Sequence, residues 1–436
     1  MAQADARDDL RASRFGLAML FVVALFNYID RSIIAILQEP LKADLGLSDT
    51  QLGALTGLSF ALLYTTMALP IARLADVWNR KRLIAGALAI WSAATAACGL
   101  ANNFATLVAL RMGVAFGEAG CVPASHSMIA DYFPLRKRAT ALALWGLSNP
   151  FGTMLGFAAG GWITQAMSWR EAFMLFGVAG VLLAPAVLTM KEPRRGRFDD
   201  HADARAQVPL REAVATLWKL KAFRFLAAGG AAHAFVVFAA HNWNAPFYGR
   251  VHGMPIGQVA LFLALAIGLG GGVGQFVGGW MADRIGRADR RWYMWLPALA
   301  SALLIPISLA VYLIRDTPTS MAFAVVQAVL LNVWFAPIVA TAQMLVAPQM
   351  RAFTSAMLVL IVNVLGLSLG PLMTGMISDA LRPAFGAESL RYAILASMGM
   401  SVAAAACFFR SGQHLMRELE GARPDVAPEA AEAVRA

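Results

Sequence analysis

Long apolar runs recur along almost the whole chain, and no other feature limits its possible folds as strongly. Of the 436 residues, 59% are hydrophobic and only 14% are charged, with a mean hydropathy of +0.61. A soluble protein of this length needs more polar surface than that. A helix needs about 20 apolar residues to cross a bilayer, so the sequence predicts an all-α polytopic membrane protein with twelve transmembrane helices. The predicted spans cover residues 15–37, 51–73, 82–101, 105–130, 138–163, 170–190, 223–247, 257–281, 292–314, 320–346, 353–379 and 389–410.

Basic residues are distributed unequally between the two sides of these spans. If residues 1–14 lie in the cytoplasm, the connections on that side carry 28 Lys and Arg, and the opposite side carries 6. The positive-inside rule then places both termini in the cytoplasm and the chain in the inner (plasma) membrane. The net charge of +10 reflects this topology and attraction to anionic lipid in the bilayer, so we expect no nucleic-acid partner. The tail contains Asp5, Asp8 and Asp9, which argues against a cleavable signal, so we expect the first helix to be retained.

One long polar stretch divides the twelve spans into two sets of six. Within it, residues 210–220 have the pattern of an amphipathic helix that lies on the cytoplasmic face. The predicted organisation is an N-terminal tail (1–14), a six-helix bundle (15–190), a cytoplasmic linker (191–222), a second six-helix bundle (223–410) and a C-terminal tail (411–436).

The two sets of spans repeat each other. Ala-Asp-x-x-x-Arg occurs at residues 75–80 and again at residues 282–287, each time at the cytoplasmic end of the second span of its set. Pro150 in the fifth span has a counterpart in Pro371 of the eleventh. A duplicated six-helix unit predicts two pseudo-symmetric bundles with a substrate site near the midplane between them.

Two groups of polar residues interrupt spans of the first set. Residues 27–31 read Asn-Tyr-Ile-Asp-Arg, and Arg111 and Glu118 lie within the fourth span. A charge at this depth costs about 2.5–3.5 kcal/mol on insertion scales, so a chain that keeps four such groups is expected to use them. Seven residues of helix bring Arg111 and Glu118 within about 20° of one face. Gly113 and Gly117 lie on the other face, where small residues let a neighbouring helix approach closely.

With these motifs, the chain resembles the major facilitator superfamily over nearly its whole length. The superfamily signature G-x-x-x-D-R-x-G-R-R/K is matched at Gly279, Asp283, Arg284, Gly286 and Arg287, and the copy at residues 72–81 keeps only Asp76, Arg80 and Lys81. The residues 27–31, the pair Arg111 and Glu118, and the exit Lys-Glu-Pro-Arg-Arg-Gly at 191–196 resemble the bacterial Spinster-like branch. Organic-anion:proton symporters share several of these features.

The resemblance implies a secondary transporter with alternating access, and the charges suggest how it is driven. Burial pushes a carboxylate toward its neutral form, while a nearby Arg pulls it back toward the anion. We therefore expect Asp30 and Glu118 to take up and release protons, and Arg31 to pair alternately with a carboxylate and an anionic substrate. The resemblance associates this Asp, Arg and Glu with proton coupling and with the polar end of the cavity. The further residues expected to bind substrate are Arg111, Tyr28 and Asn27.

The second set of spans has no carboxylate near its predicted midplane. It offers polar side chains that can hydrogen-bond a substrate, of which the chosen candidates are His241, Asn332 and Asn363. A cavity charged on one wall and mildly polar on the other suits an amphipathic anion, and the resemblance suggests a lysolipid or sphingoid-phosphate-like molecule. A proton symporter of small organic anions and a multidrug-type efflux pump stay open as alternatives.

The two Ala-Asp-x-x-x-Arg copies suggest a cytoplasmic gate. A carboxylate at a helix end can pair with Arg from a neighbouring segment and accept from another helix start. Such contacts hold the cytoplasmic side closed and break when it opens. The residues assigned to this gate are Asp76, Arg80, Lys81, Arg82, Asp283, Arg284 and Arg287.

Other function classes lack their motifs. The chain has no phosphate-cradling G-x-x-x-x-G-K-[ST] loop, no zinc motif and no nucleophile elbow, so we expect neither an enzyme nor a metal or organic cofactor. Its three cysteines are scattered through apolar runs and form no disulfide framework. The expected partners are a small-molecule or lipid substrate, protons and the bilayer, with the protein acting as a monomer.

Overall fold

The structure is a computed structural model that describes residues 2–198 and 209–421, and over these residues it contains helices and no strands. The predicted all-α fold is confirmed. Nine stretches within the described ranges are long and apolar enough to cross a membrane. The last of them, Phe353–Glu420, contains two of the predicted spans, and residues 82–101 and 138–163 are also largely helical.

The first half of the chain forms helices that proline breaks within two of the predicted spans. Pro123 and Pro150 each occupy the third residue of the helix that follows a break. A proline removes the backbone N–H that would bond the carbonyl four residues earlier, so the preceding helix stops there. The elements are α1 (Ala2–Ile36), α2 (Gln38–Leu45), α3 (Asp49–Gly53), the π-helix η1 (Ala54–Leu58), α4 (Ser59–Val77), α5 (Arg80–Cys98), α6 (Phe104–Glu118), α7 (Cys121–Tyr132), α8 (Leu135–Gly146), α9 (Ser148–Ala166) and α10 (Trp169–Val187).

The second half begins with the predicted amphipathic helix. In α11 (Leu210–Lys219), Ala213 and Leu217 are buried one turn apart while most neighbouring side chains are exposed. The elements that follow are α12 (Lys221–Arg250), α13 (Ile256–Leu263), the π-helix η2 (Ala264–Gly270), α14 (Gly271–Ile285), α15 (Trp292–Leu313), α16 (Thr317–Leu330), α17 (Phe335–Met344), η3 (Pro348–Met350), α18 (Arg351–Val362), the π-helix η4 (Asn363–Leu367), α19 (Ser368–Phe385), η5 (Gly386–Glu388), α20 (Ser389–Met398) and α21 (Met400–Gly421).

Helix continues into both segments predicted as tails. The helix α1 begins at Ala2, and α21 ends at Gly421, eleven residues beyond the last predicted span. Residues 422–436 of the predicted C-terminal tail and residues 199–208 of the predicted linker lie outside the described residues.

Backbone contacts divide the chain into two compact units. Unit 1 contains Met1–Ala202, Phe238–Leu269 and Leu367–Ile394, and unit 2 contains Asp203–Val237, Gly270–Gly366 and Leu395–Ala436. Segments of the second half therefore belong to unit 1, because α13 packs on α9 and α19 packs on α3. The division into two sequence-continuous six-helix bundles stays a prediction.

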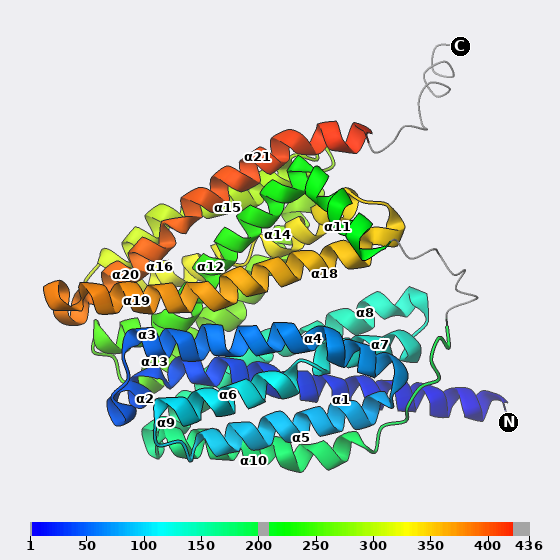
Figure 1. Cartoon of the computed structure of the whole chain (residues 1–436), viewed down its shortest axis with the longest axis horizontal. Helices are drawn as coiled ribbons and strands as arrows, with labels where there is room; N and C mark the ends of the chain where they lie inside the picture. Colours follow the sequence, from blue (N-terminus) through cyan, green and yellow to red (C-terminus); the bar gives the residue numbers. More distant parts are fainter. Residues whose placement is uncertain (1, 199–208, 422–436) are drawn as a thin grey trace. The chain divides into compact units, whose positions relative to one another are not determined.

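Glycines set the helix spacing in unit 1. The helix α5 lies beside α6 and α10, and α1 lies beside α9 (Figure 1). A Cβ atom at Gly156 of α9 would stand 2.9 Å from the carbonyl oxygen of Ile29, and one at Gly117 of α6 would stand 2.8 Å from Trp91. These helices approach closely because glycine has no side chain at the contact, as predicted for α6.

Candidate functional site

An ion pair joins α1 to α6 inside unit 1. The Arg31 Nε donates to Glu118 Oε2 at 2.8 Å. The Glu118 side chain has no exposed surface, whereas the Arg31 side chain is 28% exposed. Glu118 is the last residue of α6, immediately before the break that precedes Pro123. The structure thus brings two of the predicted residues together and leaves the Arg31 side chain partly exposed.

Three aromatic rings surround the Arg31 guanidinium. Its Cζ lies 4.6 Å from the ring centroid of Tyr64, 5.0 Å from that of Phe60 and 5.9 Å from that of Tyr28. A cation over an aromatic face is stabilised by the ring quadrupole, most strongly where water is excluded. Tyr28 was among the predicted residues. Phe60 and Tyr64, both on α4, were missed, since an aromatic residue in an apolar span gives no sign of the side chain that it contacts.

Arg111 and Asp30 complete the charged group, which we call the midspan cluster: Asn27, Asp30, Arg31, Arg111 and Glu118. Arg111 is 1% exposed and Asp30 is 3% exposed. The Arg111 Cζ lies 5.6 Å from the centroid of Phe60. Asp30 lies within electrostatic range of Arg111 and Glu118, so two carboxylates and two guanidinium groups share one buried region.

Several polar atoms of the midspan cluster lack a hydrogen-bond partner within the described structure. They are Nε and Nη1 of Arg111, Oε1 of Glu118 and Nδ2 of Asn27. Asn27 lies near Glu118 but outside hydrogen-bond geometry. Trp91 and Thr95 of α5 likewise lie near Asp30 but outside hydrogen-bond geometry, and no sequence pattern had singled them out. Most buried polar groups in proteins are paired, so this concentration of unpaired polar atoms sets the cluster apart from the surrounding helix contacts.

The three candidates on the second half of the chain do not all belong to the same unit. His241 of α12 lies in unit 1, where its ring meets that of Phe157 edge-on at 5.4 Å. In unit 2, Asn332 donates to the Ala328 carbonyl at 2.9 Å, and Asn363 begins the π-helix η4. A π-helical turn is frequent at functional sites.

At one end of unit 1, Arg80 binds a dense set of acceptors; we call this region, with Asp131 and Glu192, the basic end. Arg80 has no exposed surface and forms ion pairs with Asp131 and with Glu192, the latter at 2.9 Å. It also donates to Ser127 at 2.9 Å and to the Pro193 carbonyl at 2.8 Å. Glu192 further accepts from the backbone N–H of Lys81 at 3.0 Å, which caps α5.

The other predicted gate residues are less engaged. Lys81 donates to the carbonyls of Leu188 and Met190, whereas Arg82 is exposed. Asp76 is exposed and forms no ion pair with any described residue, so the expected pairing of Asp76 with a neighbouring Arg is not present in this conformation. In unit 2, Asp283 accepts from the Tyr293 hydroxyl at 2.8 Å. Arg284 and Arg287 are exposed, and Arg284 lies over Trp280 at 5.6 Å.

The opposite end of unit 1 contains an ionic group that sequence reasoning missed; we call it the far end and define it by Glu39, Asp49, Arg250 and Asp379. Arg250 of α12 binds both carboxylate oxygens of Asp49, at 2.8 and 3.0 Å, and also Glu39. Asp379 of α19 accepts from the backbone N–H groups of Asp49 and Thr50 at 3.1 and 2.7 Å. These bonds tie α2 and α3 to helices of the second half.

One signal could have pointed to the far end. Basic residues are scarce on that side, with only 6 Lys and Arg in the predicted connections. An Arg retained there, at the end of a span, is less easily explained by topology than one on the basic side.

Comparisons with known proteins agree with this architecture. The sequence profile of the Major Facilitator Superfamily matches residues 20–371. The chain is 31% identical over 405 residues to the "MFS-type efflux pump" of Mycolicibacterium smegmatis (strain ATCC 700084 / mc(2)155), covering 92% of this chain and 93% of the relative. It is 32% identical over 184 residues to a "Probable galactarate/D-glucarate transporter" of Bacillus subtilis (strain 168), covering 41% of this chain and 40% of that protein.

Among solved structures, a bacterial homologue of the human lysosomal transporter Spinster, in an inward-facing and unoccupied conformation, matches with a TM-score of 0.87. The two chains are 28% identical, and the match covers 93% of this chain and 98% of the other. The predicted fold and the resemblance to the Spinster-like branch are confirmed, and these relatives point to a transporter and not an enzyme.

Proposed function

Since the chain belongs to the Major Facilitator Superfamily, we propose that it is a proton-coupled transporter that moves an amphipathic anion, lysolipid-like or sphingoid-phosphate-like, by alternating access. In this proposal it spans the inner membrane as a monomer with both termini in the cytoplasm. The basic end then faces the cytoplasm, and the far end faces the opposite side.

One observation carries the proposal: the partly exposed Arg31 of the midspan cluster is paired with a fully buried carboxylate. Arg31 is 28% exposed, and its partner Glu118 is not exposed at all. An anionic substrate that binds Arg31 competes with Glu118 for the guanidinium. A buried carboxylate that loses its counter-ion is costly, and a proton removes that cost. Binding of the anion and binding of a proton are thereby linked.

The surroundings of Arg31 favour an amphipathic substrate. Tyr28, Phe60 and Tyr64 present ring faces around the guanidinium. A charged head group can take the place of Glu118 on Arg31 while an apolar body packs against such rings. The unpartnered Nε and Nη1 of Arg111 offer further donors to the same anionic group.

The two ends of unit 1 suggest the conformational state. At the far end, Arg250, Asp49 and Asp379 join α3 to α12 and α19. At the basic end, Asp76 is exposed and lacks an ionic partner among the described residues. We propose that the far-end bonds close the non-cytoplasmic side in this state and that the Asp76 contacts form when the protein turns outward.

Two other substrate classes have specific support. The relative named as an efflux pump matches over nearly the whole chain, which favours export of varied amphipathic compounds. The relative named as a sugar-acid transporter matches over 41% of the chain, which favours a small organic anion. Both alternatives use the same cation, Arg31, and differ in the size of the apolar contact that the substrate makes.

Transport into proteoliposomes distinguishes these substrates. Purified protein is reconstituted, a pH gradient is imposed, and accumulation of radiolabelled lysophosphatidylglycerol, galactarate and an amphipathic anionic dye is measured in separate samples. We expect accumulation of the lysolipid that collapses when an ionophore dissipates the gradient. Accumulation of galactarate or of the dye, without the lysolipid, would replace the proposed substrate class. Accumulation that persists without a pH gradient in every sample would contradict proton coupling.

A further inference from the structure

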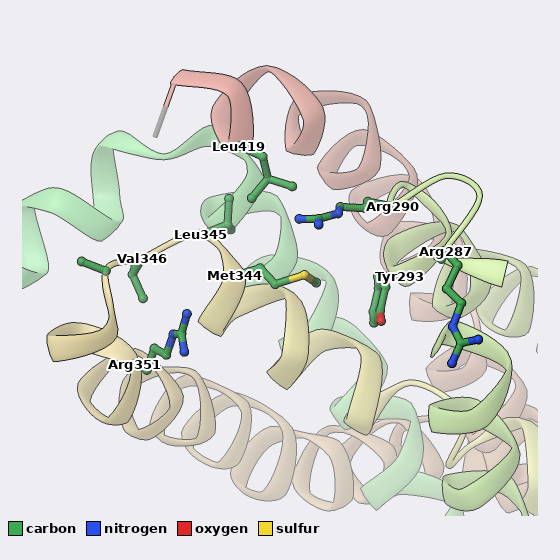
Figure 2. Close-up of a pocket in the computed structure, with 10 residues that line it drawn as sticks. Arg287, Arg290, Tyr293, Met344, Leu345, Val346, Arg351 and Leu419 are labelled. Atoms are coloured by element: carbon green, nitrogen blue, oxygen red, sulfur yellow. The ribbon is translucent and has the colours of Figure 1, made fainter. Parts of the chain in front are cut away.

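A cavity of about 840 Å³ lies in unit 2 at the ends of α14 and α17. Arg290 and Arg351 extend toward its interior from opposite sides, and Arg287 lies at its edge (Figure 2). Apolar side chains form the rest of the wall, together with the ring of Tyr293. The lining residues are Gly286, Arg287, Arg290, Tyr293, Met344, Leu345, Val346, Ala347, Arg351 and Leu419.

Comparison of the two copies of the internal repeat shows that the cavity has no carboxylate at the position equivalent to Asp131. Arg287 occupies the position that Arg80 has in the first Ala-Asp-x-x-x-Arg copy. Arg80 binds the carboxylate of Asp131, which stands three residues before Pro134. The residue three positions before Pro348 is Leu345, an apolar residue that lines the cavity. Where unit 1 places a carboxylate beside the arginine, the equivalent position of the second copy is an apolar residue.

The described carboxylates closest in sequence to the cavity bond to groups other than its arginine side chains, except Glu420, which is exposed and follows the lining residue Leu419. Asp283 accepts from Tyr293, and Asp289 accepts from the backbone N–H of Arg291 at 2.9 Å. Glu418 accepts from the backbone N–H groups of Lys221 and Ala222 at 2.7 and 3.1 Å, at the start of α12. Within residues 2–198 and 209–421, none of the three arginines that line the cavity forms an ion pair.

We propose that this cavity is a binding site for a phosphate group, separate from the midspan cluster. Arginine binds phosphate with two parallel N–H···O bonds, and basic pockets between transmembrane helices hold the head groups of anionic lipids. The apolar wall of Met344, Leu345, Val346 and Leu419 matches the acyl part of such a lipid. A free phosphate shares only the charged half of this chemistry, so the test compares the two sources.

Binding is measured on the full-length protein in a neutral maltoside detergent. Dioctanoyl phosphatidylglycerol, dioctanoyl phosphatidylcholine and inorganic phosphate are titrated separately. Saturable binding of phosphatidylglycerol that exceeds binding of phosphatidylcholine identifies a lipid head group as the ligand. Saturable binding of inorganic phosphate alone identifies a soluble anion. Absence of saturable binding in all three titrations overturns the proposal.

Substitutions locate the bound anion. The double variant Arg290→Gln/Arg351→Gln is expected to weaken binding of the responding probe by about tenfold or more, since two charge-assisted contacts are lost. The matched control Arg284→Gln removes an exposed arginine of the same region that does not line the cavity, and it should leave the affinity within about twofold. A second test, Leu345→Asp, places a carboxylate where the repeat predicts one and should also weaken binding.

Two results contradict the proposed site. One is unchanged affinity in the double variant when its elution profile and helical content match the parent protein. The other is an equal loss of affinity in Arg284→Gln, because that would reduce the effect to net charge. If the double variant does not fold, Arg351→Gln alone is compared with Arg284→Gln by the same criteria.

Discussion

Two of the arginines buried in unit 1, Arg80 at the basic end and Arg111 in α6, differ in their surroundings. Arg80 meets two carboxylates, a hydroxyl and a carbonyl. Arg111 is equally buried, yet its Nε and Nη1 have no partner within the described part of the chain. The contrast separates two uses of a buried charge. A fully paired cation holds neighbouring segments together. A partly paired cation keeps N–H donors free for a ligand that binds and dissociates.

The expected free-energy cost of removing each arginine also differs. Removing one member of a well-paired buried ion pair leaves the other charge uncompensated and costs about 3–5 kcal/mol. A cation whose donors are unpaired already carries part of its desolvation cost, so its removal costs less. Stability should therefore depend on Arg80, and transport should depend on the midspan cluster.

The largest expected effect on stability follows Arg80→Met. Asp131 and Glu192 would lose their buried counter-ion, and we expect the free energy of unfolding in detergent to fall by about 3–5 kcal/mol. Thermal unfolding followed by tryptophan fluorescence measures it. Arg82→Met, which removes an exposed neighbour, is the matched control and should change little. Equal melting temperatures for the two variants would contradict a stabilising role of the Arg80 ion pairs.

Next in size is the effect of Glu118→Gln on coupling. The amide keeps the shape of the side chain but cannot take up and release a proton, so accumulation driven by a pH gradient should fall about 10- to 100-fold. Exchange of substrate across the membrane without a gradient should persist. The control is Glu212→Gln, an exposed residue of α11. Wild-type accumulation in Glu118→Gln would remove this carboxylate from the coupling mechanism.

A smaller effect is expected at the far end from Asp379→Asn. The carboxylate caps two backbone N–H groups at the start of α3, and loss of such a cap costs about 1 kcal/mol. If these bonds close the far end, their weakening should also expose α3. Cysteine labelling at Thr50→Cys, from the far-end side, should become faster in the Asp379→Asn background. An unchanged labelling rate would show that Asp379 does not keep this end closed.

The smallest effect on stability is predicted for Arg111→Met. We expect the free energy of unfolding to stay within about 1 kcal/mol of the parent protein, since Arg111 has unpaired donors and Asp30 can bind a proton in its absence. Transport should nevertheless be lost. A loss of stability as large as that of Arg80→Met would mean that Arg111 is a structural residue and that the two arginines do not differ in use.

Much of the fold could be predicted from the sequence because its signals are local. The length of each apolar run predicts a helix directly, whereas the breaks before Pro123 and Pro150, inside the predicted spans 105–130 and 138–163, were not predicted. The position of charge within a span also identified Arg31 and Glu118 as candidate functional residues, and the structure pairs them. A buried charge needs a partner wherever the rest of the chain lies, so this inference does not require the fold.

The missed residues depend on contacts between distant segments. Arg250 and Asp49 are 201 positions apart, and each alone has the pattern of an ordinary charge at a helix end. Phe60, Tyr64 and Trp91 are aromatic residues in apolar spans, so only the packing of α4 and α5 places them beside the midspan cluster. The expected pairing of Asp76 is absent among the described residues, and the sequence pattern alone does not say in which conformation such a contact forms.

Proton uptake on ligand binding tests the central claim most directly. The anion that accumulates in proteoliposomes is added to purified protein in weakly buffered detergent solution, and the pH is followed with an indicator dye. If the anion displaces Glu118 from Arg31, binding should draw protons from solution, and Glu118→Gln should abolish most of this uptake while it still binds the anion. Binding without any proton uptake, or equal uptake in the Glu118→Gln variant, would contradict the account.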